Sequence, residues 1–185
     1  MKRIICLIIA LTALCLTPCT VFADRNDGAA PVIATVPGLI DERQTDIWVE
    51  GERLGEMVIG ARGMLHIIYV DEAMAKALRS DVTVPVPVFD LAQYYGSDAS
   101  RGKKFFIAHV DVYKPWNFDY KEVFVGKHHL QKEDILSSSM NNPFGELPSK
   151  SDGYFAFAVP ASGLKAGDEI RIGYGDYSET WKVMK

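Results

Sequence analysis

A histidine and an aspartate share one predicted strand. His109 and Asp111 stand two residues apart in the run 103–113, whose side chains alternate in character. In an extended strand this spacing places both side chains on one face, about 7 Å apart. Together they could ligate one metal ion or relay a proton. A transition-metal site usually takes three protein ligands, so a plain polar outer sheet face stays the simpler interpretation.

Nothing else in the sequence forms a recognisable catalytic set. Of the other histidines, His66, His128 and His129, the last two are neighbours, so in a strand they point to opposite faces. No acidic run has the ligand spacing of a calcium loop. The chain also lacks a Gly-x-Ser-x-Gly elbow, a phosphate-binding glycine loop and a His-Glu-x-x-His helix. We expect no catalytic residue, no metal and no cofactor. A metal-dependent or hydrolytic periplasmic enzyme using His109 and Asp111 is the alternative.

Three aromatic residues in alternate positions form the most unusual cluster, Trp116, Phe118 and Tyr120. In an exposed loop they would offer a flat apolar surface to a protein, a peptide or a glycan. The same alternation allows all three rings to close the end of a β-domain and seal its core, the usual fate of Trp and Phe. As the ligand-binding hypothesis we take these three rings, with His109 and Asp111 as nearby polar contacts.

Short β-type runs separated by Gly, Pro, Asp and Asn must position these side chains. The strongest is 103–113, and the others cover residues 57–59, 64–70, 122–125, 128–130, 153–159, 169–174 and 177–184. Asp71 caps a predicted short helix over 72–79. Residues 82–89 alternate but contain two prolines, which predicts an edge strand or an extended crossing segment. The pattern favours an all-β antiparallel sandwich of about seven strands with one short helix.

Four of these segments carry a resemblance. Residues 105–112, 124–127, 154–160 and 167–170 together resemble exported bacterial immunoglobulin-like domains of the telokin-like type, many of uncharacterised function. The resemblance covers residues 55–185 and implies an immunoglobulin-like β-sandwich. It implies no catalytic residues, so it bears on the fold rather than on function.

The N-terminus has the layout of an export signal. A short basic start precedes an apolar run over residues 4–16, and small residues Val21 and Ala23 precede a charged segment. This layout is typical of a secretory signal peptide, and the run is shorter than the roughly 20 residues that span a bilayer. We expect cleavage after Ala23, a periplasmic or secreted protein, and no transmembrane segment afterwards. Pro18 disfavours lipid attachment at Cys19.

Composition excludes several classes. The chain has 185 residues, 48% hydrophobic and 24% charged, with a net charge of −4, which argues against disorder, coiled coils and a nucleic-acid partner. Cys6, Cys15 and Cys19 all lie in the predicted signal, so the mature chain has no disulfide and no thiol chemistry.

The predicted organisation is a signal over 1–23, an N-terminal arm or linker over 24–54 and a domain over 55–185. Our leading hypothesis is an exported non-enzymatic module that binds a protein, peptide or glycan of the cell envelope. A structural or assembly component that pairs through an edge strand is a further alternative. The oligomeric state does not follow from the sequence.

Overall fold

The computed structural model describes residues 36–138 and 142–184. The predicted signal peptide, its cleavage after Ala23 and the disfavoured lipid attachment at Cys19 therefore lie outside the described residues. Within the described part, no helix is both long enough and apolar enough to cross a membrane.

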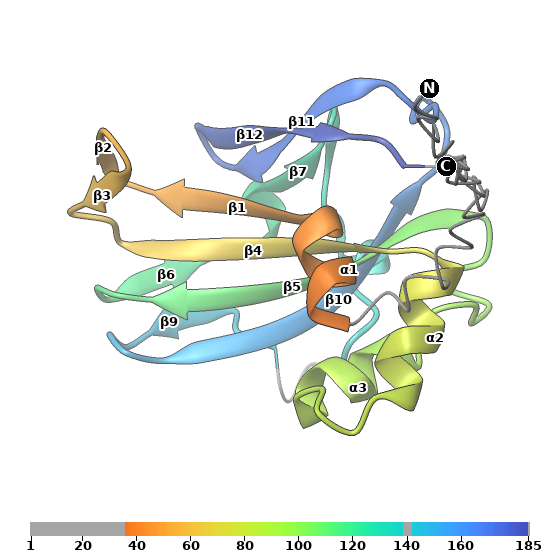
Figure 1. Cartoon of the computed structure of the whole chain (residues 1–185). Coiled ribbons are helices and arrows are strands. Elements are labelled where there is room, and N and C mark those ends of the chain that lie inside the picture. Colours follow the sequence, from red (N-terminus) through yellow and green to blue (C-terminus); the bar gives the residue numbers. More distant parts are fainter. Residues whose placement is uncertain (1–35, 139–141, 185) are drawn as a thin grey trace, which may run out of the picture. The chain divides into compact units, whose positions relative to one another are not determined.

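Most of the structure is β, in two four-stranded antiparallel sheets (Figure 1). The first has the order β1 (Gln44–Val49), β4 (Gly63–Val70), β5 (Lys103–Val112), β10 (Asp152–Pro160). The second has the order β12 (Tyr177–Lys182), β11 (Glu169–Tyr174), β7 (Val123–Val125), β8 (His128–His129). Two further antiparallel pairs join β2 (Glu52–Leu54) to β3 (Met57–Ile59), as a hairpin, and β6 (Trp116–Phe118) to β9 (Gly145–Leu147), which are far apart in the chain.

The helices are short. There are three described α-helices instead of the single one expected, α1 (Val36–Arg43), α2 (Glu72–Ser80) and α3 (Val86–Ala92), and two 3-10 turns, η1 (Tyr120–Glu122) and η2 (Lys132–Asp134). The predicted cap of α2 is confirmed, because the Asp71 carboxylate accepts the Met74 N–H at 2.8 Å. Arg43 at the end of α1 donates to the same carboxylate at 3.0 Å, which ties α1 to α2.

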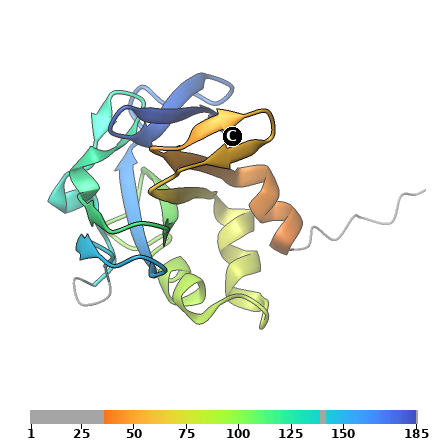
Figure 2. The same cartoon turned by 90° about the vertical axis from the view of Figure 1, so that its left-hand side faces the viewer.

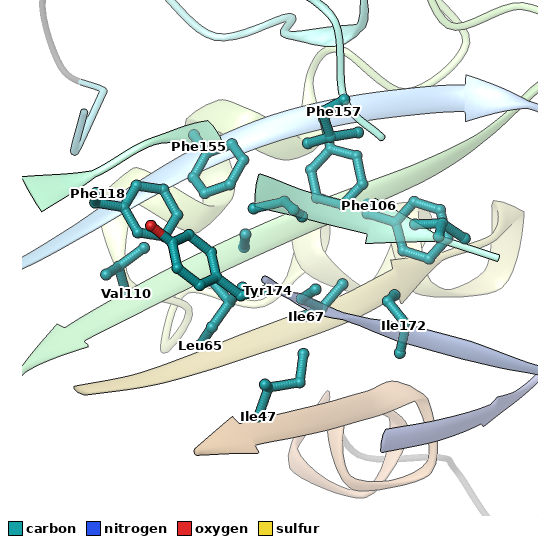
Figure 3. Packing of buried hydrophobic residues seen from close by; sticks show 14 of the residues in the cluster. Ile47, Leu65, Ile67, Phe106, Val110, Phe118, Phe155, Phe157, Ile172 and Tyr174 are labelled. Atoms are coloured by element: carbon teal, nitrogen blue, oxygen red, sulfur yellow. The ribbon is translucent and has the colours of Figure 1, made fainter. Parts of the chain in front are cut away.

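One core cluster contains buried residues from both four-stranded sheets. The predicted apolar face of β5 is confirmed, since Phe106, Ala108, Val110 and Val112 are all buried there. Figure 3 shows Phe106 among side chains from both sheets, including Phe157 of β10 and Ile172 of β11. The predicted burial of Trp181 is also confirmed, in the same cluster.

The opposite face of the first sheet is covered only in part. Near one end, Phe105 and Ile107 of β5 pack under the helices with Met74 and Leu78 of α2. Figure 2 shows the three helices gathered on one side of the sheet. Further along β5, His109 and Asp111 lie on this face beyond the apolar cluster, each partly exposed.

The segment 82–89 is not the edge strand that we expected. Residues 82–84 form a turn and α3 begins at Val86. Pro87 stands in the first helical turn, where the backbone N–H that proline lacks has no partner within the helix. Val88 and Leu91 are buried, so packing against the sheet selects the helix. Because this segment is not a strand, we no longer expect it to pair with another chain as an edge strand.

The described part of the expected arm also belongs to the fold. β1 pairs with β4 over its whole length, and Ile47 and Val49 are buried in the core. α1 packs on the same sheet, and residues 34–185 form one compact unit. The compact unit thus begins before residue 55, where the predicted organisation placed the start of the domain.

Candidate functional site

The register of the first sheet builds a row of polar side chains across four strands. Asp46 of β1 lies opposite His66 of β4, and His66 lies opposite His109 of β5. His109 in turn lies opposite Tyr154 of β10. The row lies on the face opposite the main core, next to the edge of the helical layer, because each of its members belongs to the outward set of its strand.

The next row places two carboxylates opposite each other. Asp111 of β5 is the cross-strand partner of Asp152 of β10. Like charges directly opposite on one sheet face destabilise the pairing of their strands. The sheet therefore carries an unfavourable pair here unless positive charge lies between them.

Carboxylates and imidazoles alternate through the two rows. The Nδ1 atom of His66 lies 2.7 Å from Oδ1 of Asp46, and its Nε2 atom lies 3.2 Å from Oδ2 of Asp111. The Nε2 atom of His109 lies 3.4 Å from Oδ1 of Asp111 and 3.5 Å from Oδ2 of Asp152. The side chain of Gln44 donates to Asp46 at 2.7 Å and fixes the outer carboxylate.

The two histidines have pKa values shifted in opposite directions. Burial disfavours the charged form of His66, but the hydrogen bond and charge of Asp46, followed by those of Asp111, outweigh it and raise the pKa of His66. For His109 burial dominates and lowers the pKa of its ring, although the charges of Asp111 and Asp152 oppose it. Burial thus favours the neutral form of the His109 ring, in which one nitrogen has a lone pair to offer.

Nε2 of His109 is the one buried side-chain polar atom without a hydrogen bond among the described residues. The ring cannot turn freely to find a partner, because it stacks on Tyr154 with centroids 4.1 Å apart and planes 7° from parallel. On its other side it stacks on His66 at 5.4 Å. Buried polar groups are nearly always satisfied, so a nitrogen that faces two carboxylates at 3.4 and 3.5 Å without a hydrogen bond leaves room for a ligand between them.

His66, His109 and Asp111 meet the geometric demand of a metal ion. One ligand atom from each lies within 4.8 Å of the other two. Tetrahedral zinc with bonds near 2.1 Å separates its ligand atoms by about 3.4 Å, close to the distances from Asp111 to both rings. Asp46 holds the far nitrogen of His66, the usual support of a metal-bound histidine. Asp111 and Asp152 have side chains 32% and 61% exposed, so an ion can enter from their side.

The three aromatic residues predicted to form a binding surface do not form an exposed patch. Trp116 and Phe118 are buried, 4% and 0% exposed, and Tyr120 is partly buried against the same core. Trp116 packs on Gly63, where an added Cβ atom would meet the ring at 2.8 Å. The three rings close the end of the core, which was the other interpretation of their alternation, and we withdraw them as ligand contacts.

The predicted pair His109 and Asp111 does come together, and among the other histidines it is His66 that joins the pair, whereas Asp46 and Asp152 were missed. His66 joins through the β4–β5 register, whereas His128 binds Asp134 in the region of the second sheet. Alternation in 64–70 already placed His66 opposite the core side, and this signal could have linked it to His109. Asp46 could not have been found, because the segment that holds it was taken for an arm.

A scan against protein-family models and searches of curated proteins and of solved structures give no match to this chain. The function must therefore be argued from the geometry.

Proposed function

We propose that this protein is an exported metal-binding protein that holds one divalent transition-metal ion between His66, His109 and Asp111. The buried, unpartnered Nε2 atom of His109 carries the proposal. Leaving such an atom unsatisfied costs about 1–3 kcal/mol, and a metal ion would satisfy it. The ion would also place positive charge between Asp111 and Asp152, which oppose each other across the strands.

The donor set favours a zinc-like ion over calcium or magnesium. Two imidazole nitrogens and one carboxylate suit zinc, copper or nickel, whereas calcium and magnesium prefer oxygen ligands throughout. The ion would replace the Nε2 proton of His66 while Nδ1–H still donates to Asp46. This proposal departs from our sequence-based expectation of no metal.

The position of Asp152 favours a binding role over a catalytic one. Its carboxylate lies 3.5 Å from Nε2 of His109 but outside the group of three mutually close ligand atoms, so it would supply a fourth ligand after a shift of its exposed side chain. Four protein ligands make a closed site, whereas catalytic zinc sites keep one position for water or substrate. We therefore keep the non-enzymatic interpretation and replace its aromatic ligand surface with the histidine cluster. The hydrolytic alternative would require Asp152 to stay away from the ion.

We also propose that the fold is an immunoglobulin-like β-sandwich. Two antiparallel four-stranded sheets that share one core are consistent with an immunoglobulin-like sandwich, the class that the four sequence segments resemble. Export to the periplasm or medium is proposed from the pattern of residues 1–23 alone.

Titration of the chelator-stripped protein with zinc by calorimetry near neutral pH tests the metal proposal. We expect one ion per chain, and a loss of at least about tenfold in affinity for each of His66→Ala and His109→Ala. Asp46→Asn should weaken binding within the 10–100-fold range typical of outer-shell partners. Calcium should not compete.

His128→Ala is the matched control, because His128 also contacts an aspartate but in the region of the other sheet. It should bind zinc like the parent protein. Circular dichroism of each variant verifies that the fold is kept. Absence of zinc binding by the parent, or equal losses in His109→Ala and His128→Ala, would overturn the proposal.

A further inference from the structure

A second candidate site lies in a groove of about 670 Å³ beside the histidine cluster. Helix α3 forms one wall of this groove, and the first residues of β10 form the other. Its volume falls within the range of about 300–1,000 Å³ that small-molecule sites occupy. Of its lining, the metal proposal above uses only Asp152.

The charges in this groove have one sign. Its described lining residues include two carboxylates, Asp90 of α3 and Asp152 of β10, and no lysine, arginine or histidine. Neither carboxylate forms an ion pair with a lysine or arginine anywhere in the described chain. Asp152 has a 61% exposed side chain, and Asp90 is exposed as well. The groove thus favours a cation and opposes an anion.

Aromatic and aliphatic side chains supply the rest of the lining. Tyr94 stands on the α3 side and Tyr154 on the β10 side, with Leu91 also in the wall. Tyrosine rings attract ammonium groups through their faces and bury apolar carbon at the same time. Tyr154 is held by its stacking on His109, so this wall is ordered before any ligand arrives.

We propose that the groove binds a small organic amine in its protonated form, with the ammonium group at Asp90 and Asp152 and the apolar body against Tyr94 and Leu91. The volume suits a single small molecule, and the two carboxylates, neither of which pairs with a lysine or arginine among the described residues, select its charge. A carboxylic acid of the same size would meet only repulsion, and a neutral alcohol would lose the ionic contacts.

Three probes of similar size and different charge test the proposal by nuclear magnetic resonance on isotope-labelled protein. They are phenethylamine, phenethyl alcohol and hydrocinnamate. We expect phenethylamine to shift the backbone amide signals of Gln93 and Gly153 saturably, with an affinity at least about tenfold above that of the alcohol. Hydrocinnamate should cause no saturable shift.

Asp152 also borders the histidine cluster, so the titration is run in EDTA. Its outcome then does not depend on whether that cluster takes a metal.

Substitutions at matched aspartates locate the contact. Asp90→Asn should lower the affinity for phenethylamine by about fivefold and leave that for the alcohol unchanged. Asp98→Asn is the control, because Asp98 is exposed, pairs with Arg101 and does not line the groove. Equal binding of amine and alcohol, shifts confined to other regions, or equal effects of the two substitutions would overturn the proposal.

Discussion

His66 and His109 show how two identical side chains, paired across neighbouring strands, acquire different chemistry. Both rings are partly buried on the same sheet face. His66 has a carboxylate at each nitrogen and a raised pKa, whereas His109 makes no hydrogen bond through Nε2 and has a lowered pKa. Burial lowers the pKa of both rings. The two pKa values differ because the carboxylates form hydrogen bonds of good geometry with His66 and not with His109.

Asp46→Asn tests this difference in the metal-free protein. The pKa of His66 is higher in the folded than in the unfolded state. The pair of His66 with Asp46 therefore stabilises the folded protein fully at pH values below the unfolded-state pKa. This stabilisation is lost as the pH rises through the folded-state pKa. The substitution should therefore cost more stability at about pH 5.5 than at about pH 8.5. The Asp46 side chain is 44% exposed, so solvent weakens the pair and we expect a difference of about 1 kcal/mol.

Urea unfolding at the two pH values, in EDTA, measures the effect. The lowered pKa of Asp46 keeps that carboxylate ionised over the whole interval, so the histidine titration alone sets the sign. Asp98→Asn, which removes a remote exposed carboxylate, should show no such dependence on pH. A larger cost at the higher pH would contradict the assignment.

At the scale of elements, two segments with ambiguous sequence patterns adopt a structure other than the predicted one because of how they pack. Residues 82–89 alternate like a strand, yet Val88 and Leu91 are buried on a helix that covers the sheet. The 116–120 segment looks like an aromatic loop, yet β6 turns Trp116 and Phe118 inward while Asn117 stays exposed. In both cases alternation was real, but it could not tell which neighbour would cover the apolar residues.

Phe118→Ala measures how far β6 contributes to the core. The Phe118 ring is fully buried and contacts Phe155 and Tyr174, so we expect a loss of about 3–5 kcal/mol in the free energy of unfolding. Tyr120→Ala, at a partly exposed ring two residues away, should cost clearly less. Urea denaturation compares the two. Similar small losses for both would mean that the ring is a surface feature after all.

At the scale of the molecule, the first sheet serves two purposes. One face joins the second sheet in the main core, and the other carries helices at one end and the polar rows beyond them. The proposed metal site would therefore rest on strands, where the positions of His66, His109 and Asp111 are held by backbone pairing on both sides. The groove proposed to bind an amine borders this site because α3 covers part of the same face next to β10.

Truncation tests where the folded domain begins in the sequence. A chain that starts at Ala34 should keep the far-ultraviolet circular dichroism and the urea midpoint of the chain that starts at Asp24, because residues 34–185 form one compact unit. A chain that lacks residues 24–54 should not fold. It loses α1 and β1, and with them the buried Ile47 and Val49 and the pairing partner of β4. Cooperative unfolding of the shorter chain would restore the boundary at residue 55.

The sequence by itself determined the β character, most strand positions, the two faces of β5 and the cap of α2. Each of these depends on side-chain period or on contacts within a few residues. It also placed His109 and Asp111 on one face. Only the tertiary structure decided that His66, Asp46 and Asp152 join them, that 116–120 closes the core, and that the proline segment is helical. Strand partners and register arise between residues far apart in the chain, where packing of whole faces chooses among arrangements that local patterns leave equal.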